Sequence, residues 1–489
     1  MSRHLRNPYF LFLLPLFFVL HVCTENPGLI SFRFGFFIFL EFSIIALLIS
    51  FLFRFIVKDI RKAALIGFFI IAFDIFFGSF QDFLLKHFAS NFFVRYIFIL
   101  PATLVVIILL TIYLKRTKKN FYQACLFLNL LFIVLIAMDL VKLFSFSLEK
   151  KEPPFTDISN QFIKCDTCSK PDIYMIITDG YAGDTVLKSY FNYDNSAFKS
   201  SLQQRGFHVI NNPRSNYNFT VYTIASMFSM DYIQNMDKHK MVTQQDIYLT
   251  RDIIKKNNFT EFLYSNGYTI ENNSFMSPGG TENRIRLYYF PPKRGLFTSQ
   301  TFVNRFTRNI GYHFPFYSDL YYRYIKNEEY NNRLMDSLTR KAAATKSEHP
   351  RFIFSHLIMP HHPYYYDSLG NRNPYVDSRR DVEDGKKDYI QYLTYCNKRL
   401  LDLVDTIISS SQKPPIIILM SDHGYRRFYD KKYNDFQFMT LNTVLFPNRN
   451  YSGFYDGMSN VNQLRVLLNS QFGQKLPLLK DSTSLFIEP

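Results

Sequence analysis

Five long apolar segments in the first third of the chain restrict its possible folds more than any other feature. They are Pro8–Val22, Gly35–Val57, Ala63–Leu85, Val94–Leu114 and Phe121–Phe144. Each approaches the ~20 residues that an α-helix needs to cross the hydrocarbon core of a bilayer. Only helices and closed barrels satisfy their own backbone inside lipid. The sequence therefore predicts a transmembrane domain of five helices over residues 1–145.

Basic residues are concentrated in two of the loops between these segments. They are Arg54, Lys58, Arg61 and Lys62 in one loop, and Lys115, Arg116, Lys118 and Lys119 in the other. Cytoplasmic loops carry an excess of Lys and Arg, so the N-terminus is predicted to be cytoplasmic. An odd number of spans then places everything after about residue 145 outside the cytoplasm. We expect a multi-pass protein of the bacterial inner (plasma) membrane with a periplasmic or extracellular second half.

Three acidic residues, Glu41, Asp74 and Asp139, lie inside the predicted spans. Acids in such positions are candidates for ion or proton pathways. The spans lack the inverted repeat of a transporter, which favours helix packing or contact with lipid headgroups instead. For Asp139 the sequence offers a simple partner, because Lys142 follows it by one helical turn.

The whole chain is basic, with 56 Lys and Arg against 40 Asp and Glu and a formal net charge of +16. Such a balance suits a nucleic-acid binder or an enzyme that works at an anionic membrane surface. No Lys/Arg tract is dense enough for a nucleic-acid-binding arm. We therefore expect an integral membrane protein without a nucleic-acid partner.

Cys165 and Cys168 form a C-x-x-C pair just ahead of the second half. A zinc knuckle would need a second such pair, and the other three cysteines do not form one. A small local disulfide, if this segment is exported, and an unpaired pair of thiols both remain open.

After a polar linker over residues 146–170, apolar runs of strand length alternate with segments of helical pattern. Strands are predicted over Asp172–Thr178, Phe207–Ile210, Tyr268–Ile270, Arg351–Ile358, Ile416–Met420 and Thr443–Phe446. Helices are predicted over Asp194–Gly206, Thr220–Ser229, Asp252–Asn266, Tyr317–Ala343, Asp388–Ser409 and Val461–Phe472. This alternation indicates an α/β domain over residues 171–489, with a mainly parallel sheet and helices on both faces.

Polar residues directly follow three of the predicted strands. They are Asp422 and His423 after Ile416–Met420, Asp179 after Asp172–Thr178, and His361 after Arg351–Ile358. In doubly wound sheets the chemistry lies just past the carboxyl ends of the strands. Asp and His together supply oxygen and nitrogen ligands for a metal. Thr220 begins a predicted helix, where unpaired N–H groups favour an anion such as a phosphate.

The order of these residues resembles the alkaline phosphatase superfamily. The series is D-G after the first strand, a Thr at a helix start, P-H-x-P and then S-D-H-G. The stretch T-V-Y-T-I-A-S-M-F-S that begins at Thr220 is similar to the T-x-x-S-V-P-C-M-F-S stretch of lipid A phosphoethanolamine transferases. Five spans ahead of an exported catalytic domain also resemble those enzymes and the lipoteichoic acid synthases. The resemblance implies an alkaline phosphatase-like αβα fold for the second half.

The resemblance also implies roles for individual residues. Thr220 corresponds to the nucleophile. Together with Asp179, Asp422 and His423 it also corresponds to the ligands of one divalent ion, zinc or manganese. His361 corresponds to a histidine that contacts the substrate phosphate or a second zinc. His356, inside the preceding strand, is either a core histidine or a residue with a role. The transferases usually carry Glu where this chain has Asp179, and the phosphodiesterase and sulfatase branches carry Asp.

Departures from the family patterns narrow the chemistry. Sulfatases need a Cys or Ser in a C/S-x-P/A-x-R motif for conversion to formylglycine, whereas this chain has Thr220 at that place. Two-zinc phosphatases need a further histidine downstream, and no histidine follows His423, so a complete second metal site is not expected. Candidates for neutralising phosphate oxygens are Arg284, Arg286, Arg426 and Arg427.

The resulting hypothesis is a metal-dependent phosphoryl-group transferase. It would take phosphoethanolamine or glycerophosphate from a membrane phospholipid, form a phosphothreonine, and modify an envelope glycan or lipid. A phosphodiesterase or phosphatase of the same sulfatase-like fold, with water as the acceptor, is the alternative. A membrane protein whose exported domain binds a ligand without turnover is the alternative from another class.

Overall fold

The computed structural model describes residues 4–26, 30–88, 92–148, 154–163, 168–234, 241–242, 244–283, 285, 294–310, 315–373, 382–428 and 430–487. The chain divides into two compact units. One unit comprises residues 1–151 with 290–321, and the other comprises residues 152–289 with 322–489.

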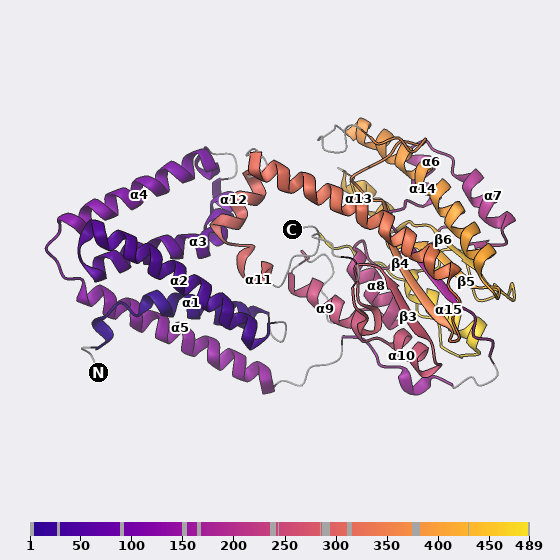
Figure 1. The fold of residues 1–489 in the computed structure, drawn as a ribbon, viewed down its shortest axis with the longest axis horizontal. Coiled ribbons are helices and arrows are strands. Elements are labelled where there is room, and N and C mark those ends of the chain that lie inside the picture. Colours follow the sequence, from indigo (N-terminus) through magenta and orange to yellow (C-terminus); the bar gives the residue numbers. More distant parts are fainter. Residues whose placement is uncertain are drawn as a thin grey trace. The chain divides into compact units, whose positions relative to one another are not determined.

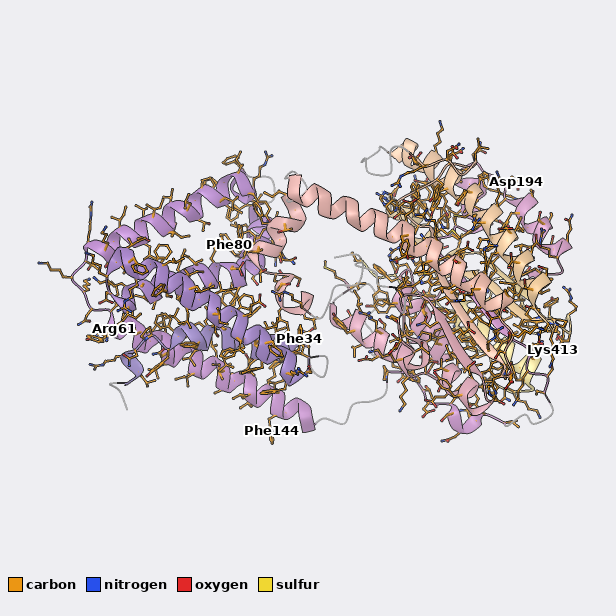
Figure 2. All side chains as sticks on the ribbon, viewed as in Figure 1. Phe34, Arg61, Phe80, Phe144, Asp194 and Lys413 are labelled. Carbon is orange, nitrogen blue, oxygen red and sulfur yellow. The ribbon has the colours of Figure 1, made fainter. Side chains whose placement is uncertain are left out.

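The first unit contains the five predicted apolar helices (Figure 1). They are α1 (Phe10–Glu25), α2 (Phe32–Val57), α3 (Ile60–Phe88), α4 (Tyr96–Arg116) and α5 (Tyr122–Leu148). The last four are long and apolar enough to cross a membrane, whereas α1 has only 16 residues. Large apolar side chains such as those of Phe80 and Phe144 project outward from these helices (Figure 2). An apolar exterior of this kind is suited to lipid rather than to water.

A segment from the second half of the chain belongs to this helical unit. It includes α11 (Gly295–Thr298), α12 (Phe302–Ile310) and the beginning of α13 (Pro315–Ala344). Two of the intramembrane acids have their partners here. Asp74 accepts a hydrogen bond from the backbone N–H of Val303 over 3.1 Å, and Glu41 forms an ion pair with Arg294.

The suggested pairing of Asp139 with Lys142 is wrong. Asp139 instead lies 3.3 Å from the Nδ1 atom of His21 and accepts a hydrogen bond from the hydroxyl of Thr24. Lys142 forms an ion pair with Glu25 over 2.6 Å. Both acids therefore join α5 to α1, because the packing of two helices offered closer partners than one turn of the same helix.

The second unit is built on a six-stranded sheet with the order β2-β6-β5-β1-β4-β3. Its strands are β1 (Ile173–Asp179), β2 (His208–Val209), β3 (Thr269–Asn273), β4 (Arg351–Pro360), β5 (Ile416–Ser421) and β6 (Asn442–Leu445). β5, β1, β4 and β3 run parallel. At one edge β6 pairs antiparallel with β5, and β2 pairs antiparallel with β6. All residues of β1, β4 and β5 are buried, as expected for parallel strands that are covered on both faces. The predicted mainly parallel sheet is confirmed.

Helices cover both faces of this sheet (Figure 1). They are α6 (Asp184–Ser189), α7 (Ser196–Gln204), α8 (Thr220–Ser229), α9 (Gln244–Lys255), α10 (Asn258–Ser265), α14 (Val382–Ser410), α15 (Asn460–Phe472) and most of α13. Phe354 of β4 packs against Phe228 of α8, and Ser355 forms a hydrogen bond with Thr339 of α13. Successive strand residues face opposite sides, so α8 and α13 cover opposite faces of the sheet.

Two local features refine the sequence analysis. The segment predicted as one helix over Asp252–Asn266 forms α9 and α10, because the side chain of Asn257 caps α10 by accepting the N–H of Thr260. Cys168 is disulfide-bonded, whereas Cys23, Cys125 and Cys396 are free thiols.

A buried arginine joins the start of three parallel strands. Arg351, at the start of β4 and 5% exposed, donates to Asp172 beside β1 over 2.6 Å. It also donates to Glu271 of β3 over 3.1 Å and to the carbonyl of Ala342 over 2.9 Å. Removing a buried partner leaves the remaining charges without compensation, which costs more than the loss of an exposed pair.

We therefore expect Arg351→Ala to lower the apparent free energy of unfolding by about 3 kcal/mol. Arg205→Ala is the matched control, because Arg205 forms a similar two-bond pair with the half-exposed Asp405. The control should cost less than about 1 kcal/mol. Urea unfolding of the full chain in detergent, followed by tyrosine fluorescence since the chain has no Trp, measures both values. Equal losses would contradict the assigned role of Arg351.

Candidate metal centre

The sheet order brings the predicted site residues together. β1 lies between β4 and β5, and all three strands are parallel, so their carboxyl ends meet at one edge. Asp179 is the last residue of β1, and Asp422 and His423 follow β5 directly. Thr220 is the first residue of α8, as predicted. His361 directly follows β4.

Four side chains converge at this edge with ligand atoms only a few ångströms apart. The Nε2 atom of His423 lies 3.5 Å from Asp179 Oδ1 and 3.5 Å from Asp422 Oδ2. It lies 3.4 Å from the hydroxyl oxygen of Thr220. The structure thus places the four predicted ligands around one point.

His356 adds a further nitrogen to the cluster. It projects from β4 on the face toward α8, two residues after Phe354, and its side chain is fully buried. Its Nε2 atom lies 3.8 Å from Asp179 Oδ2 and 3.9 Å from Asp422 Oδ2. One ligand atom from each of Asp179, His356 and Asp422 lies within 4.8 Å of the others. Of the two interpretations left open for His356, the structure favours a role in the site.

Backbone groups orient these ligands. The Nδ1 atom of His423 lies 2.8 Å from the carbonyl oxygen of Gly424, which can only accept, so Nδ1 carries the proton. The lone pair of the neutral ring is then on Nε2 and faces the carboxylates. Asp422 Oδ1 accepts from the N–H of Gly180 and from that of His423, which turns Oδ2 toward the cluster.

The electrostatics of the cluster fit a cation. Burial, and in second place the negative charge of Asp422, raise the pKa of Asp179 well above its usual range. Burial lowers the pKa of His423 well below its usual range and that of His356 to about 4. Asp179 Oδ1, Asp422 Oδ2 and both ring nitrogens of His356 are buried without a hydrogen-bond partner.

Buried polar atoms without a partner are costly. One divalent cation could bind Asp179, Asp422 and the Nε2 atoms of His356 and His423, which face one another. This donor set suits zinc or manganese, so the residues present fit the ion that the resemblance implies.

His361 lies beside this cluster because β4 is irregular. The pairing of β1 with β4 shifts from Thr178↔Leu357 to Asp179↔Pro360, which advances β4 at its end. Gly180, with a φ of +71°, lies between the two rings: a Cβ on it would be 3.8 Å from the ring of His423 and 3.9 Å from that of His361. Burial and the charge of Arg426 lower the pKa of His361 well below its usual range, so its ring is neutral.

Of the four candidate arginines, Arg426 is the one with described contacts at the centre. It lies 4.6 Å from the ring of Phe219, directly before Thr220, and donates to the carbonyl of Asn218. Its charge opposes the rise in the pKa of Asp179. The charge of Arg427, together with burial, lowers the pKa of His362 to about 4. Arg284 and Arg286 lie outside the described residues.

Two contributors were missed from the sequence. Glu328 of α13 is buried, and its negative charge adds to the rise in the pKa of Asp179. Asn460, at the start of α15, donates to the carbonyl oxygen of Ser421 over 3.2 Å and supports the turn after β5. Neither residue follows a predicted strand, so no sequence pattern pointed to them.

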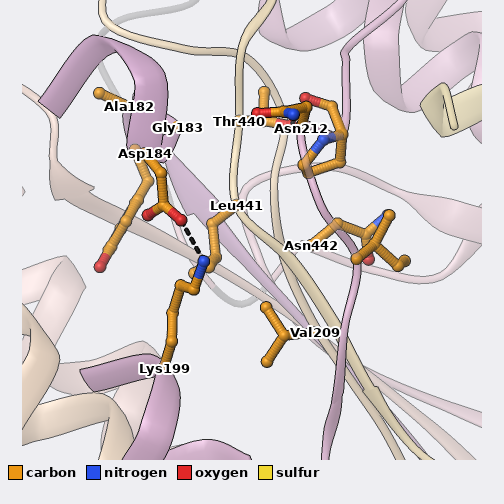
Figure 3. A pocket seen from close by; sticks show the side chains of 12 residues that line it. Ala182, Gly183, Asp184, Lys199, Val209, Asn212, Thr440, Leu441 and Asn442 are labelled. Atoms are coloured by element: carbon orange, nitrogen blue, oxygen red, sulfur yellow. Dashed lines mark hydrogen bonds and ion pairs between the residues drawn. The ribbon is translucent and has the colours of Figure 1, made fainter. Parts of the chain in front are cut away.

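A small cavity lies elsewhere in the same unit, between α6, α7, β2 and β6 (Figure 3). Asp184 and Lys199 form an ion pair at its wall, and Asn212 and Thr440 also line it. The five predicted site residues are not part of its lining. This cavity is therefore separate from the strand-end cluster.

Comparisons with known proteins agree with the superfamily that the residues resemble. A family model described as Sulfatase matches residues 191–462, which is more than half of the chain and includes Thr220, His361, Asp422 and His423. Asp179 lies just before the matched region. The sequence matches none of the curated proteins.

Several solved structures are similar to this chain. The C-terminal periplasmic domain of EcEptC from Escherichia coli is 12% identical, covers 68% of this chain and 93% of its own, and has a TM-score of 0.40. The corresponding domain of the phosphoethanolamine transferase EptC from Campylobacter jejuni is 14% identical, with 67% and 95% coverage and a TM-score of 0.38. A protein from Bacteroides thetaiotaomicron that is described as a putative sulfatase is 11% identical and has a TM-score of 0.41. The match covers 65% of this chain and 74% of that protein.

We expect the purified chain to bind one zinc or manganese ion, and to lose it in Asp422→Asn. His356→Ala should weaken binding at least about tenfold, because it removes a nitrogen that faces both carboxylates. His208→Ala is the control, since His208 is a partly exposed residue of β2 that stacks on Tyr451. Competition with a chromophoric chelator measures the affinities. Unchanged affinity in His356→Ala would remove this residue from the centre.

Metal binding should also release protons, and more of them as the pH falls. Below its raised pKa the carboxyl of Asp179 carries a proton that an incoming cation must displace. His356 contributes little release above about pH 5, because its lowered pKa keeps it neutral. Calorimetric titration in buffers of different ionisation enthalpy, from about pH 5 to about pH 8, counts these protons. A proton release that stays constant over this range would contradict the raised pKa of Asp179.

Proposed function

Because the chain belongs to the sulfatase family, we propose that its metal centre transfers a phosphoryl group from a membrane phospholipid headgroup to an envelope glycan or lipid. The observation that carries this proposal is the position of Thr220. Thr220 is the first residue of α8, and its hydroxyl oxygen lies 3.4 Å from the Nε2 atom of His423. It lies beside buried carboxylate and imidazole atoms that have no hydrogen-bond partner. A hydroxyl in such a place is a candidate nucleophile.

The identity of this nucleophile favours phosphoryl over sulfuryl transfer. Sulfatases act through formylglycine, which is made from Cys or Ser. Thr220 bears a methyl group on the same carbon as its hydroxyl and is not a precursor of that aldehyde. A threonine oxygen attacks phosphorus directly and forms a phosphate ester. The similarity of the stretch after Thr220 to that of phosphoethanolamine transferases supports the same choice.

The residues of the site divide the work of the proposed reaction. Asp179, Asp422 and His423, with His356, would hold the divalent ion. Its Lewis acidity would lower the pKa of a hydroxyl and offset charge on phosphate oxygens. The free N–H groups at the start of α8 face the same oxygens. Neutral His361 suits a hydrogen bond to the phosphate better than the donation of a full proton.

The reaction then consists of two displacements at phosphorus. In the first, the bond to the diacylglycerol oxygen breaks as the bond to the Thr220 oxygen forms, and the proton lost by the Thr220 hydroxyl leaves on diacylglycerol. In the second, an acceptor hydroxyl attacks the phosphothreonine and the Thr220 hydroxyl is restored. The ethanolamine or glycerol ester stays on the phosphorus throughout, so phosphoethanolamine or glycerophosphate is transferred whole.

The proposed site faces the periplasm or the cell exterior of a bacterium. The basic loops between α2 and α3 and between α4 and α5 support a cytoplasmic N-terminus, and five helices then place the second unit outside. The disulfide of Cys168 suits an oxidising compartment. The domains of the two similar transferases are also described as periplasmic.

Hydrolysis is the second candidate, and one observation favours it. Asp179 stands where the transferases usually have Glu and where hydrolytic branches of the superfamily have Asp. In a hydrolase, water would take the place of the acceptor hydroxyl. Headgroup phosphate recovered on an envelope glycan or lipid supports transfer, and its release into solution indicates hydrolysis.

We expect Thr220→Ala to lower turnover of phosphatidylethanolamine or phosphatidylglycerol vesicles by about a thousandfold or more, while the metal stays bound. Intact-mass spectrometry of the wild type should detect the headgroup phosphate on the protein, and peptide mapping should place it on Thr220. Thr223→Ala is the matched control, because this hydroxyl lies one turn further along α8 and bonds to the carbonyl of Tyr217. Wild-type turnover in Thr220→Ala would refute the proposed nucleophile.

A further inference from the structure

One face of α3 is polar although the helix is otherwise apolar. Asp74, Gly78, Gln81 and Asp82 recur every three to four residues, so they share this face. Lipid offers no partner to such groups, and acids in a span therefore need an explanation. Their partners come from residues 294–310, more than two hundred residues further along the chain and part of the same unit.

Backbone groups make the first contacts. The N–H of Val303, in the first turn of α12 where N–H groups have no partner within the helix, donates to Asp74 over 3.1 Å. The N–H of Gly78 donates to the carbonyl of Gln300 over 2.8 Å. A Cβ on Gly78 would lie 2.7 Å from that carbonyl oxygen and would also collide with the side chain of Gln300. Only glycine permits this approach.

A buried arginine makes the strongest contact. Arg305 of α12 is 7% exposed and donates to the two oxygens of Asp82 over 2.6 Å and 2.8 Å. It also donates to the side-chain oxygens of Gln81 and Gln300. Two parallel bonds between a guanidinium and a carboxylate give both strength and a defined orientation.

Aromatic packing completes the interface. The ring of Phe302 lies 5.5 Å from that of Phe73 and 5.0 Å from that of Phe77. In α11 the ring of Phe297, 1% exposed, lies between those of Phe18 and Phe34. In this segment the arginine therefore pairs with an acid of the spans, and the phenylalanines pack against phenylalanines of the spans.

We propose that residues 294–310 are a docking element and that the polar face of α3, with Asp74, Gly78 and Asp82, is its receptor rather than an ion pathway. The chain passes between the two units at three places, 151/152, 289/290 and 321/322. Docking therefore attaches the catalytic unit to the membrane unit by more than its N-terminal linker. Resting on the proposed function, this second attachment should favour turnover of lipid substrates over that of soluble ones.

A charge exchange tests the docking itself. In the full chain, Asp82→Arg and Arg305→Asp should each lower the apparent unfolding temperature by about 5 °C or more. The first leaves the buried Arg305 facing a like charge, and the second places a buried carboxylate next to Asp82. The double variant should recover at least half of the loss. Gly78→Ala should also destabilise, whereas Gly385→Ala, where a Cβ meets open space, should not.

The exposed pair of Glu25 and Lys142 in the same unit provides the charge control. Glu25→Lys should shift the unfolding temperature by less than about 1 °C, because exposed ion pairs contribute little. Single variants that unfold like the wild type, or a double variant without recovery, would overturn the docking element. Proton or sodium flux into liposomes that contain the wild type, lost in Asp74→Asn, would show that the acids form an ion pathway instead.

Two substrates test the consequence. The undocked variants should lose about tenfold in turnover of phospholipid vesicles, because the effective concentration of the bilayer at the site falls. They should keep turnover of the soluble diester bis(p-nitrophenyl) phosphate within about twofold. Equal loss on both substrates, or none on lipid, would overturn the role of docking. A wild type that does not act on lipid would refute the proposed function and leave the result of the charge exchange standing.

Discussion

The site depends on one electrostatic constraint: carboxylates and neutral imidazoles share a space from which water is excluded. Asp179 and Asp422 repel each other there, and burial raises the pKa of both. The lone pair of His423 Nε2 faces them because the carbonyl of Gly424 holds the proton on Nδ1. Each group is unfavourable alone, and all of them become favourable around one cation. A fold that keeps this arrangement rigid is preorganised for a metal.

The scaffold meets this constraint with backbone groups. The N–H groups of Gly180 and His423 take one oxygen of Asp422, so that only the other is free for the cluster. The shifted pairing at the end of β4 brings His361 to the other side of Gly180. Thr220 reaches the same point from the start of α8, where the helix favours an anion. The ends of β1, β4 and β5 and the start of α8 would thus together position the cation, the nucleophile and the phosphate.

The same rule governs the membrane unit. Polar atoms in apolar surroundings are tolerated where the chain supplies their partners. Asp82 pairs with Arg305, Asp74 accepts from the backbone of Val303, and one oxygen of Asp139 has His21 and Thr24 as partners. These pairings give the intramembrane acids a structural role. They also tie the spans to a segment that lies between β3 and β4 in sequence.

Much of this protein followed from the sequence alone. Hydropathy determined the five helices, apolar runs determined β1, β4 and β5, and the residues after these runs supplied Asp179, His361, Asp422 and His423. The cap at Asn257, the partner of Asp139, the face of β4 on which His356 lies and the place of residues 294–310 emerged only from the tertiary structure. The physical reason is distance along the chain. Apolar periodicity and helix starts are local properties, which a short stretch of sequence contains. Which polar atoms meet depends on packing between stretches that lie hundreds of residues apart, as Arg305 and Asp82 do.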